Sequence, residues 1–299
     1  MKTLQIIWQK IAPNGLVVFI RFLCEPQLYK IRRKAVLKFY KKNGENEPVE
    51  IKEGLKFLKY HKFTPFPFKW TKKYEKLLPE VFRDETEQRF YVLFENKKLY
   101  YPQQFTKMMA VWGTRSILKE QDPLSPHLYL TPNFKIEPDS IIIDAGVAEG
   151  NFALSVVEKA KKLYLIECDP NWLATLKVTF APWKEKVVFV EKYLSDINDE
   201  TNITIDQLIQ PDPKENYFVK MDIEGFEKKA LAGMQKLISS AKFLKMNICT
   251  YHHPNDLSEI ESIIRNYGFK WEVSNGYILY FQPGDDPTFR KALIRAEKQ

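Results

Sequence analysis

The sequence predicts an α/β protein with a doubly wound, mainly parallel sheet, a C-terminal antiparallel hairpin and a basic α+β region at the N-terminus. From residue 141 onward, short apolar runs alternate with segments of helical periodicity. Such alternation is typical of a parallel sheet covered on both faces, with ligands at the carboxyl ends of the strands. Residues 1 to about 135 lack it and are rich in Lys and aromatic side chains. We therefore expect a basic accessory or substrate region over 1–119 and a ligand-binding domain over 120–299.

The overall composition is that of a globular protein. The 299 residues are 44% hydrophobic and 28% charged, which excludes a disordered or fibrous chain. Cys24, Cys168 and Cys249 are too scattered for a disulfide framework, and no CxxC pair suggests zinc. A reducing compartment, and so a cytoplasmic location, is the expectation.

The positive charge belongs to the N-terminal part of the chain. Residues 1–135 carry 26 Lys and Arg against 13 Asp and Glu, whereas the remainder carries 20 against 25, within a net charge of +8. This asymmetry predicts an anionic neighbour: a membrane surface, a phosphorylated lipid-linked glycan carrier or nucleic acid. A solvated basic face without a ligand is the alternative.

The first 24 residues are apolar but interrupted. Lys10, Pro13, Asn14 and Arg21 break every run that approaches the roughly 20 apolar residues of a membrane helix. A small-residue cleavage site is missing, so no signal peptide is expected. An amphipathic helix at the inner face of a membrane is one interpretation, and a helix packed on its own domain is the other.

Three features stand out before residue 120. The segment RRKAVLKFYKK (32–42) has helical spacing, and RFYVLFENKKLYYP (89–102) predicts a hairpin that turns at Asn96. Residues 56–76 interleave seven Lys with aromatic side chains, and two prolines keep the middle of this stretch extended.

The elements of the α/β part follow in order. We expect strands at 141–146, 163–169, 187–194, 217–223 and 243–251, and helices at 151–160, 171–180 and 257–267. Asn151 is expected to cap the first helix and Gly268 to end the last. Asn275-Gly276 between two strand-like runs, 270–274 and 277–282, predicts the C-terminal hairpin.

The first strand runs into a glycine turn, DAGVAEGNFA (144–153). A dinucleotide fold needs a third small residue where this chain has Asn151, and no Lys-Ser/Thr follows as in a P-loop. The pattern that fits is D-x-G-x-A-x-G, which begins at Asp144 and ends at Gly150. It favours a ligand without a pyrophosphate, and a tight turn without a ligand is the alternative.

Acidic residues follow the next two strands. Glu167 lies 21 residues after Gly146, where an acid typically accepts hydrogen bonds from ribose hydroxyls. Asp169 precedes Pro170 and is the expected helix cap instead. Ser195 and Asp196 follow the third strand and are candidates either for an adenine amino group or for capping a turn.

The segment VKMDIEGFEKKALAGM (219–234) resembles the fourth-strand motif of the FkbM-type methyltransferases, K-x-D-x-E-G-x-E-x-x-x-L-x-G. Seven positions match: Lys220, Asp222, Glu224, Gly225, Glu227, Leu231 and Gly233. The glycine turn, IECDP, LSD, the lead-in at 120–130 and the segment 250–269 are also similar to that family. The resemblance covers about 120–282, and the first 115 residues show nothing specific to the family.

The resemblance implies a Rossmann-like fold, S-adenosylmethionine as methyl donor and O-methylation of a sugar, so that the acceptor is a glycan or glycoconjugate. The cofactor-binding residues expected are Asp144, Ala145, Gly146, Glu149, Gly150, Asn151, Glu167, Ser195, Asp196 and Asp222. The chain departs from the commonest family pattern at Ala148 and in its basic N-terminal region.

A sugar hydroxyl is a poor nucleophile, so a base or a metal should lie beside it. Asp222 ends the fourth strand, and His252 and His253 follow the fifth. Our hypothesis is that one histidine takes the proton while Asp222 orients it; the other histidine faces away if the segment is extended. His127 could reach the site, because lead-in segments often fold over the cofactor, but a capping or packing role is the expectation. Asp222, Glu224 and the histidines could bind a divalent metal, but no metal-specific spacing supports this and no metal site is expected.

Two rival functions remain. A nucleic-acid methyltransferase would use the basic aromatic stretch 56–76, but base-amine methylation usually goes with D/N-P-P-Y where this chain has Asp-Ile-Glu-Gly. A non-catalytic module docking on membranes or glycans is the other, although intact Asp144, Glu167 and Asp222 argue against decay of the site. The sugar, the hydroxyl and the oligomeric state, including a homo-oligomer, stay open.

Overall fold

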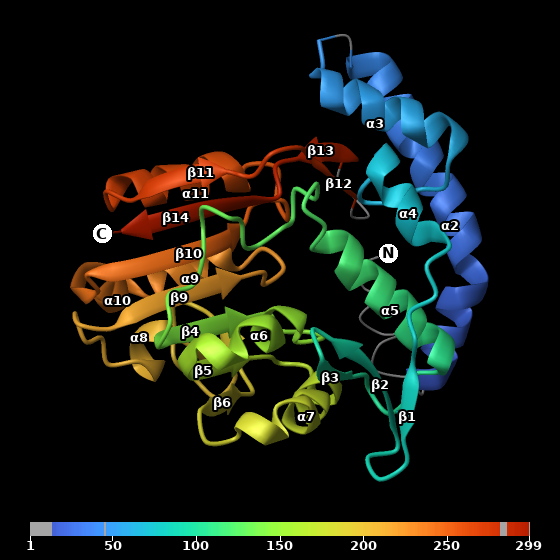
Figure 1. Ribbon diagram of the computed structural model, residues 1–299. Coiled ribbons are helices and arrows are strands. Elements are labelled where there is room, and N and C mark those ends of the chain that lie inside the picture. Colours follow the sequence, from blue (N-terminus) through green and yellow to red (C-terminus); the bar gives the residue numbers. More distant parts are fainter. Residues whose placement is uncertain (1–13, 45, 282–285, 299) are drawn as a thin grey trace. The chain divides into compact units, whose positions relative to one another are not determined.

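The computed structural model describes residues 14–44, 46–281 and 286–298, with side chains from residue 27 onward (Figure 1). The start of the expected N-terminal amphipathic segment therefore lies outside the described residues. The chain divides into a first unit, Met1–Lys76 with Gly276–Arg290, and a second unit, Leu77–Asn275 with Lys291–Gln299. The boundary expected between 119 and 120 falls inside the second unit. None of the described helices is long and apolar enough to cross a membrane.

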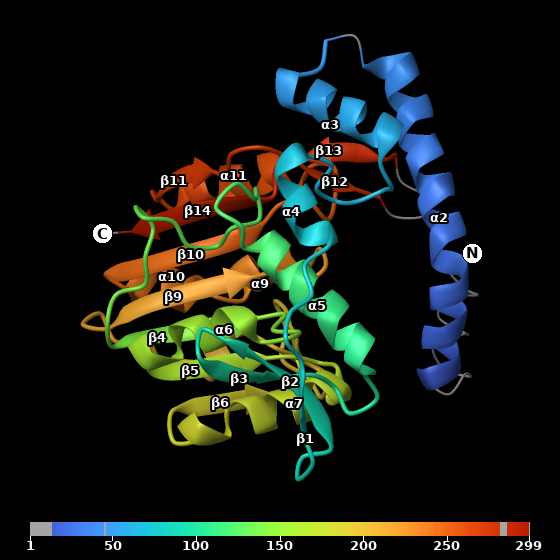
Figure 2. The same cartoon turned by 45° about the vertical axis from the view of Figure 1, so that its right-hand side comes forward.

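The first unit is built on two helices (Figure 2). Its elements are α2 (Asn14–Asn43), α3 (Val49–Tyr60), the 3-10 turn η1 (Lys69–Thr71), α4 (Lys72–Glu75), and the antiparallel strands β12 (Ile278–Tyr280) and β13 (Thr288–Arg290). Val36 and Tyr40 of α2 pack with Ile51 of α3 and Phe289 of β13 in one apolar core. The Tyr40 hydroxyl accepts a hydrogen bond of 2.9 Å from the Phe289 backbone N–H, which fixes β13 to α2.

The second unit begins with the predicted hairpin, which is confirmed. Strand β2 (Arg89–Phe94) pairs antiparallel with β1 (Phe82–Asp84) and with β3 (Lys97–Tyr100). Glu95 and Asn96 both have positive φ, 49° and 63°, as a two-residue type I′ turn requires. Helix α5 (Lys107–Glu120) follows, capped by the Thr106 hydroxyl on the Met109 N–H.

A seven-stranded sheet forms the centre of the second unit, in the order β11-β14-β10-β9-β4-β5-β6. The strands are β4 (Ser140–Ala145), β5 (Ala160–Ile166), β6 (Val187–Val190), β9 (Asn216–Met221), β10 (Phe243–Cys249), β11 (Lys270–Val273) and β14 (Leu293–Lys298). Only β14 runs antiparallel to its neighbours in this sheet. The predicted doubly wound, mainly parallel α/β fold is confirmed.

Short helices cover both faces of this sheet (Figure 1). They are α6 (Asn151–Val156), η2 (Val157–Lys159), α7 (Pro170–Thr179), η3 (Ala181–Trp183), α8 (Ile205–Leu208), α9 (Glu227–Ala232), α10 (Gln235–Ser240) and α11 (Asp256–Asn266), with the small strand pair β7 (Tyr193–Leu194) and β8 (Asn202–Ile203). Successive side chains of β4 point to opposite faces of the sheet and pack in two different cores. Ile142 packs with the residues of α6 and α7, and Ile143 packs with those of α9, α10 and α11.

The expected C-terminal hairpin between 270–274 and 277–282 is wrong. Strand β11 pairs with β14, and Ile278–Tyr280 pairs with β13. Asn275-Gly276 does turn the chain, with φ of 79° at Gly276, but this is where the chain passes from the second unit to the first. A turn signal is local, whereas the choice of strand partner depends on distant residues that bury its faces.

The expected helix cap at Asn151 is also wrong. The cap of α6 is Gly150 with φ of 82°, and Asn151 is the first helical residue. A Cβ on Gly150 would lie 2.6 Å from the Leu176 side chain, so only glycine fits this cap. Asp169 caps α7 as predicted.

Candidate functional site

The strand order reverses between β4 and β9, and the carboxyl ends of these strands open onto a cavity of about 290 Å³. Reversal of this kind creates the crevice in which open α/β sheets bind ligands. The wall comes from Gly146 and Ala148 after β4, Ile166–Cys168 at the end of β5, Trp172 of α7, Lys192–Leu194, Asp222–Glu224 after β9, and Phe226.

Gly146 lies at the point where the first turn meets the end of β9. Its φ is 71°, and a Cβ there would stand 1.8 Å from the Asp222 carbonyl oxygen. Ala148 is also left-handed, with φ of 47°, and its N–H donates to Glu167 Oε2 at 2.9 Å. The small residues of the motif are therefore required by close backbone approach along the cavity wall.

Glu167 is buried and faces the cavity with both carboxylate oxygens held in place. Besides the bond from Ala148, Oε1 accepts the Asp169 N–H at 2.8 Å. Each oxygen keeps a second lone pair for a ligand hydroxyl. Asp169 turns away to cap α7, accepting the Asn171 N–H at 2.7 Å. The residues present thus fit a ligand that carries a ribose diol.

Asp144 and Lys220 form a buried ion pair beneath the turn. They are directly opposite each other in β4 and β9, and Nζ lies 3.0 Å from Asp144 Oδ1. The same ammonium donates to the carbonyl oxygens of Ala145, at 3.2 Å, and Gly146, at 2.7 Å. Burial raises the pKa of Asp144 against the opposing charge of Lys220. Lys220, which the sequence singled out only as a motif match, is the group that holds the turn onto β9.

Seven of the expected cofactor-binding residues are not part of the cavity wall. Ser195 is buried and its hydroxyl donates to Asp196 Oδ1 at 3.0 Å, while the neighbouring Leu194 lines the cavity instead. Glu149 is half-buried. Burial, and then the charge of Glu120, raise its pKa to about 7. Asn151 starts α6. Asp144, Ala145 and Gly150 shape the turn from behind as buried residues.

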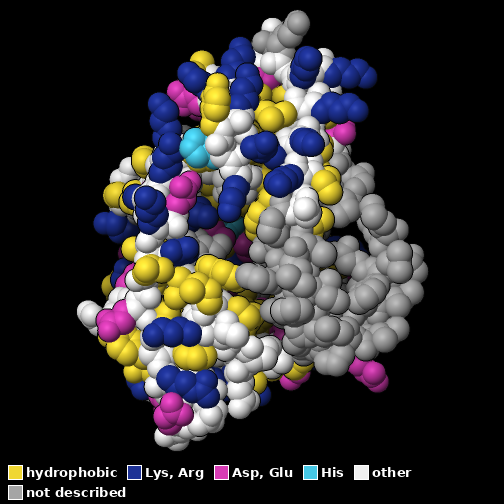
Figure 3. Space-filling model, turned by 90° about the vertical axis from the view of Figure 1, so that its right-hand side faces the viewer, with side chains coloured by type: hydrophobic (Ala, Val, Ile, Leu, Met, Phe, Trp, Pro, Cys, Tyr) yellow, Lys and Arg dark blue, Asp and Glu magenta, His cyan; other side chains and the backbone are white. Residues whose placement is uncertain are grey.

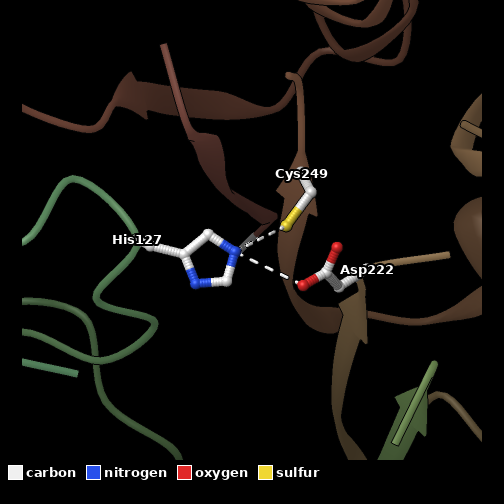
Figure 4. Close-up of side chains that lie close together, drawn as sticks. All are labelled: His127, Asp222 and Cys249. Carbon is white, nitrogen blue, oxygen red and sulfur yellow. Dashed lines mark hydrogen bonds and ion pairs between the residues drawn. The ribbon is translucent and has the colours of Figure 1, made fainter. Parts of the chain in front are cut away.

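The Asp222 carboxylate is surrounded by four side chains from two segments. Tyr129 donates its hydroxyl to Oδ2 at 3.0 Å, and Tyr251 donates to Oδ1 at 3.0 Å. His127 Nε2 lies 3.3 Å from Oδ2, and His252 Nε2 lies 3.4 Å from Oδ1. Figure 4 shows His127 and Asp222 pointing toward one another, with Cys249 beside them. We call these five residues, Asp222 with its four partners, the Asp222 cluster.

The cluster keeps Asp222 ionised. Burial alone would raise the pKa of this carboxyl, but the hydrogen bond and charge of His127, together with Lys220 and His252, hold it well below its usual range. For His252, burial lowers the pKa, while Glu227, whose Oε1 is 3.0 Å from Nδ1, raises it; the net shift is upward. Asp222 is thus a fixed anion, and His127, Lys220 and His252 stabilise its ionised form.

His253 does not join the cluster. It is exposed, and its ring lies so close to Gly225 that a Cβ there would be 2.3 Å from His253 Nε2. As expected for consecutive residues, one histidine faces inward and the other outward. Glu224 is exposed at the cavity wall, and the buried Glu227 accepts the Ile223 N–H at 3.0 Å.

Sequence reasoning favoured a capping or packing role for His127 over one at the site, and it missed Tyr129, Tyr251 and Cys249. Their spacing holds the signal that could have found them, because residues two apart in an extended segment point the same way. Cys249 and Tyr251 are such a pair. His127 and Tyr129 are also two apart, with His127 in a turn, and all four residues lie beside Asp222.

Two groups in the described part of the chain bring metal-ligand atoms within 4.8 Å of one another: His127, Asp222 and Cys249, and Asp222, Glu227 and His252. His127 Nε2 lies 3.6 Å from Cys249 Sγ. Both Asp222 oxygens already accept tyrosine hydroxyls, so a hydrogen-bond network accounts for the arrangement, and we assign no metal to it.

Comparison with known proteins gives a family match. Residues 102–271 match the family described as "Methyltransferase FkbM domain". No curated protein matches the chain.

Three similar solved structures are distant in sequence. A methyltransferase FkbM from Methylobacillus flagellatus KT has 20% identity and a TM-score of 0.44, over 62% of this chain and 54% of that chain. This chain thus spans about half the length of that protein. A magnesium protoporphyrin IX methyltransferase from Synechocystis PCC 6803 with bound SAM has 13% identity and a TM-score of 0.35, over 54% and 71%. An rRNA methylase from Streptococcus thermophilus has 15% identity and a TM-score of 0.34, over 55% and 90%.

Proposed function

Because this chain belongs to the FkbM methyltransferase family, with S-adenosylmethionine as its cofactor, we propose that it methylates a sugar hydroxyl of a polysaccharide or glycoconjugate. The observation that carries the choice of a hydroxyl acceptor is the Asp222 carboxylate at the cavity wall. A fixed anion there can accept a hydrogen bond from a hydroxyl and orient it, which supplies much of the rate of an in-line transfer.

The cofactor brings a sulfonium methyl group, and the chain supplies binding and orientation. Gly146 and Ala148 leave room for the cofactor's amino-acid end, and Glu167 offers two oxygens to the ribose hydroxyls. Trp172 and Leu194 add apolar surface for the adenine. Asp222 and Glu224 remain at the end of the cavity that receives the acceptor.

The charge of the cavity wall disfavours a nucleic-acid acceptor. Its acidic side chains are Glu167, Asp222 and Glu224, against the single cation Lys192. A polyanionic backbone would be repelled at this wall, whereas a neutral sugar offers hydroxyl donors to the carboxylates. The chain directly after β9 also reads Asp-Ile-Glu-Gly, which lacks the prolines of base-amine methyltransferases.

The test is transfer of labelled methyl from S-adenosylmethionine to a panel of acidic and neutral polysaccharides, nucleotide sugars and bulk RNA. We expect alkali-stable label, as an ether, in the carbohydrate fraction and none in RNA. Label in RNA that falls steeply with salt would instead establish the nucleic-acid alternative. Failure of the protein to bind S-adenosylhomocysteine in calorimetry would favour the non-catalytic alternative.

The first unit motivates a second proposal, contact with anionic lipid at the inner face of the cytoplasmic membrane. Helix α2 exposes Lys30, Lys34, Lys38, Lys41 and Lys42, and residues 27–44 contain no Asp or Glu. Figure 3 shows many Lys and Arg side chains, in dark blue, over the upper part of one face. Among the lysines of α2, Ile31 is 62% exposed, which suits a lipid headgroup layer better than a purely polar partner.

Vesicles test this contact. The protein should sediment with phosphatidylserine vesicles but not with phosphatidylcholine, and the binding should weaken as salt rises. Substituting Lys34→Glu, Lys38→Glu and Lys41→Glu together should weaken it by at least about 100-fold, at about 1 kcal/mol per charge. Lys184→Glu, an exposed lysine of the second unit, is the matched control. Equal binding to both lipids, or to RNA in place of lipid, contradicts the proposal.

A further inference from the structure

Within the Asp222 cluster, only Asp222 belongs to the cavity wall. His252 is 1% exposed, and its two ring nitrogens face carboxylates: Nδ1 faces Glu227 Oε1 at 3.0 Å and Nε2 faces Asp222 Oδ1 at 3.4 Å. Neither nitrogen is directed at the space where an acceptor would lie. His252 is therefore placed to act on Asp222, not on a substrate.

His127 is in the same position on the other carboxylate oxygen. It is 3% exposed, and its Nε2 faces Asp222 Oδ2 at 3.3 Å. Its Nδ1 is buried without a hydrogen-bond partner among the described residues. An acceptor hydroxyl in the cavity meets the carboxylate before it meets either imidazole.

We propose that Asp222 itself accepts the proton of the acceptor hydroxyl, and that His127 and His252 are positioning residues that hold its carboxylate toward the cavity. This assignment rests on the proposed O-methyl transfer. It exchanges the roles expected from sequence, in which a histidine took the proton and Asp222 oriented it.

The reaction requires one proton acceptor. The hydroxyl oxygen forms a bond to the methyl carbon, the carbon–sulfur bond breaks with its electron pair left on sulfur, and the O–H proton passes to an Asp222 oxygen. Bond formation makes the hydroxyl a protonated ether, which is a far stronger acid than any carboxylic acid. A carboxylate that is always ionised is therefore basic enough, and its negative charge stabilises the positive charge that develops on oxygen.

The neighbours of Asp222 come from five parts of the second unit. The titratable and charged groups facing it or acting on it are His127 and Tyr129 from the lead-in, Glu120 of α5, Asp144 and Lys220 of the central strands, Glu224 and Glu227 beyond β9, and Cys249, Tyr251 and His252 at the end of β10. Each histidine favours the ionised form of Asp222, so loss of either should make protonation of Asp222 easier.

The first experiment replaces the carboxylate with its amide. Asp222→Asn keeps the shape but cannot accept a proton, so we expect kcat to fall by about 10²–10⁴-fold. The affinity for S-adenosylhomocysteine should change only a few-fold, which shows that the variant is folded. Activity within about tenfold of the wild type would overturn the assignment.

The second experiment separates positioning from proton transfer through the pH profile. His127→Gln and His252→Gln should each lower kcat by about 10–100-fold. They should also bring an acidic limb into the accessible part of the kcat profile, where the wild type has none, because Asp222 loses a neighbour that favours its ionised form. His61→Gln, the same change in the first unit, is the control and should alter neither quantity. Absence of that acidic limb in both variants, with activity lost as fully as in Asp222→Asn, would make a histidine the base.

A chelation series completes the test. Activity lost on treatment with EDTA and restored by Zn²⁺ or Mg²⁺ would replace proton transfer to Asp222 by metal assistance and overturn the inference. Failure of the proposed function looks different: the wild-type protein would then methylate no hydroxyl at all, whereas failure of this inference leaves the wild type active and Asp222→Asn nearly so.

Discussion

At the scale of single residues, the turn of the site depends on a glycine at which an added Cβ would clash. Gly146 and Gly268 share the left-handed conformation, with φ of 71° and 73°, but differ in their surroundings. A Cβ on Gly146 would stand 1.8 Å from the Asp222 carbonyl oxygen, whereas a Cβ on Gly268 would meet nothing within 4 Å. Substitution at Gly268 therefore measures backbone strain alone, whereas substitution at Gly146 measures strain together with the steric clash.

We expect Gly268→Ala to lower the free energy of unfolding by roughly 1–2 kcal/mol, the strain of a left-handed alanine. Gly146→Ala should lower it by at least about 3 kcal/mol, because β4 and β9 must also move apart. Urea unfolding of both variants measures the difference, and calorimetry should find the affinity for S-adenosylhomocysteine reduced only in Gly146→Ala. Equal losses of stability would contradict the predicted contact.

Glu149 carries a pH dependence of stability. Its pKa in the folded protein is raised from 4.5 to about 7, mainly by burial. Between these values the unfolded chain loses the proton that the folded chain keeps, so stability falls as pH rises and levels off above pH 7.

Glu149→Gln mimics the protonated form. It should unfold like the wild type at pH 4 and be more stable at pH 8, by at most about 3 kcal/mol. Melting temperatures without cofactor at pH 4, 6 and 8 test this, with the exposed Glu185→Gln as control. A variant that is less stable than the wild type at pH 8 would show that Glu149 is held ionised in the fold.

At the scale of elements, local sequence signals predicted the turns correctly, but they predicted the wrong partner for a strand that pairs with a distant part of the chain. The hairpin of β2 and β3 was predictable because the two strands and their turn are contiguous. Strand β11 instead pairs with β14. The sequence of β14, LIRAEK, has no alternation of apolar and polar residues that would predict a strand. Residues 293–298 form a strand because they lie between β10 and β11 and are hydrogen-bonded along both edges.

The turn of the β2–β3 hairpin can be improved. Glu95 adopts φ of 49° at a cost that glycine or asparagine would largely avoid. The double change Glu95→Asn with Asn96→Gly should raise the free energy of unfolding by roughly 1 kcal/mol. Chemical unfolding measures it, and Glu80→Asn outside the turn should have no effect. A loss of stability would mean that the Glu95 side chain contributes more than its backbone strain removes.

At the scale of the whole molecule, the two units should respond differently to the cofactor. The cavity lies within the second unit, so S-adenosylhomocysteine at 100 times its Kd should stabilise that unit by about 2.7 kcal/mol. Hydrogen exchange should show slower opening in β4, β5 and β9 and unchanged exchange in α2 and α3. Equal protection of both would show that the units open together.

The sequence by itself determined the α/β class, the glycine turn, the helix cap at Asp169 and the family, because these depend on residues close together in the chain. Only the tertiary structure decided that 276–290 belongs with the N-terminal helices and that His253 faces outward. It also decided that His127, Tyr129, Tyr251 and His252 meet on Asp222. Those partners are about 30 to 95 positions from Asp222 along the chain. The parallel register of β4, β9 and β10 sets which strand ends meet at the cavity, and no local pattern encodes that register.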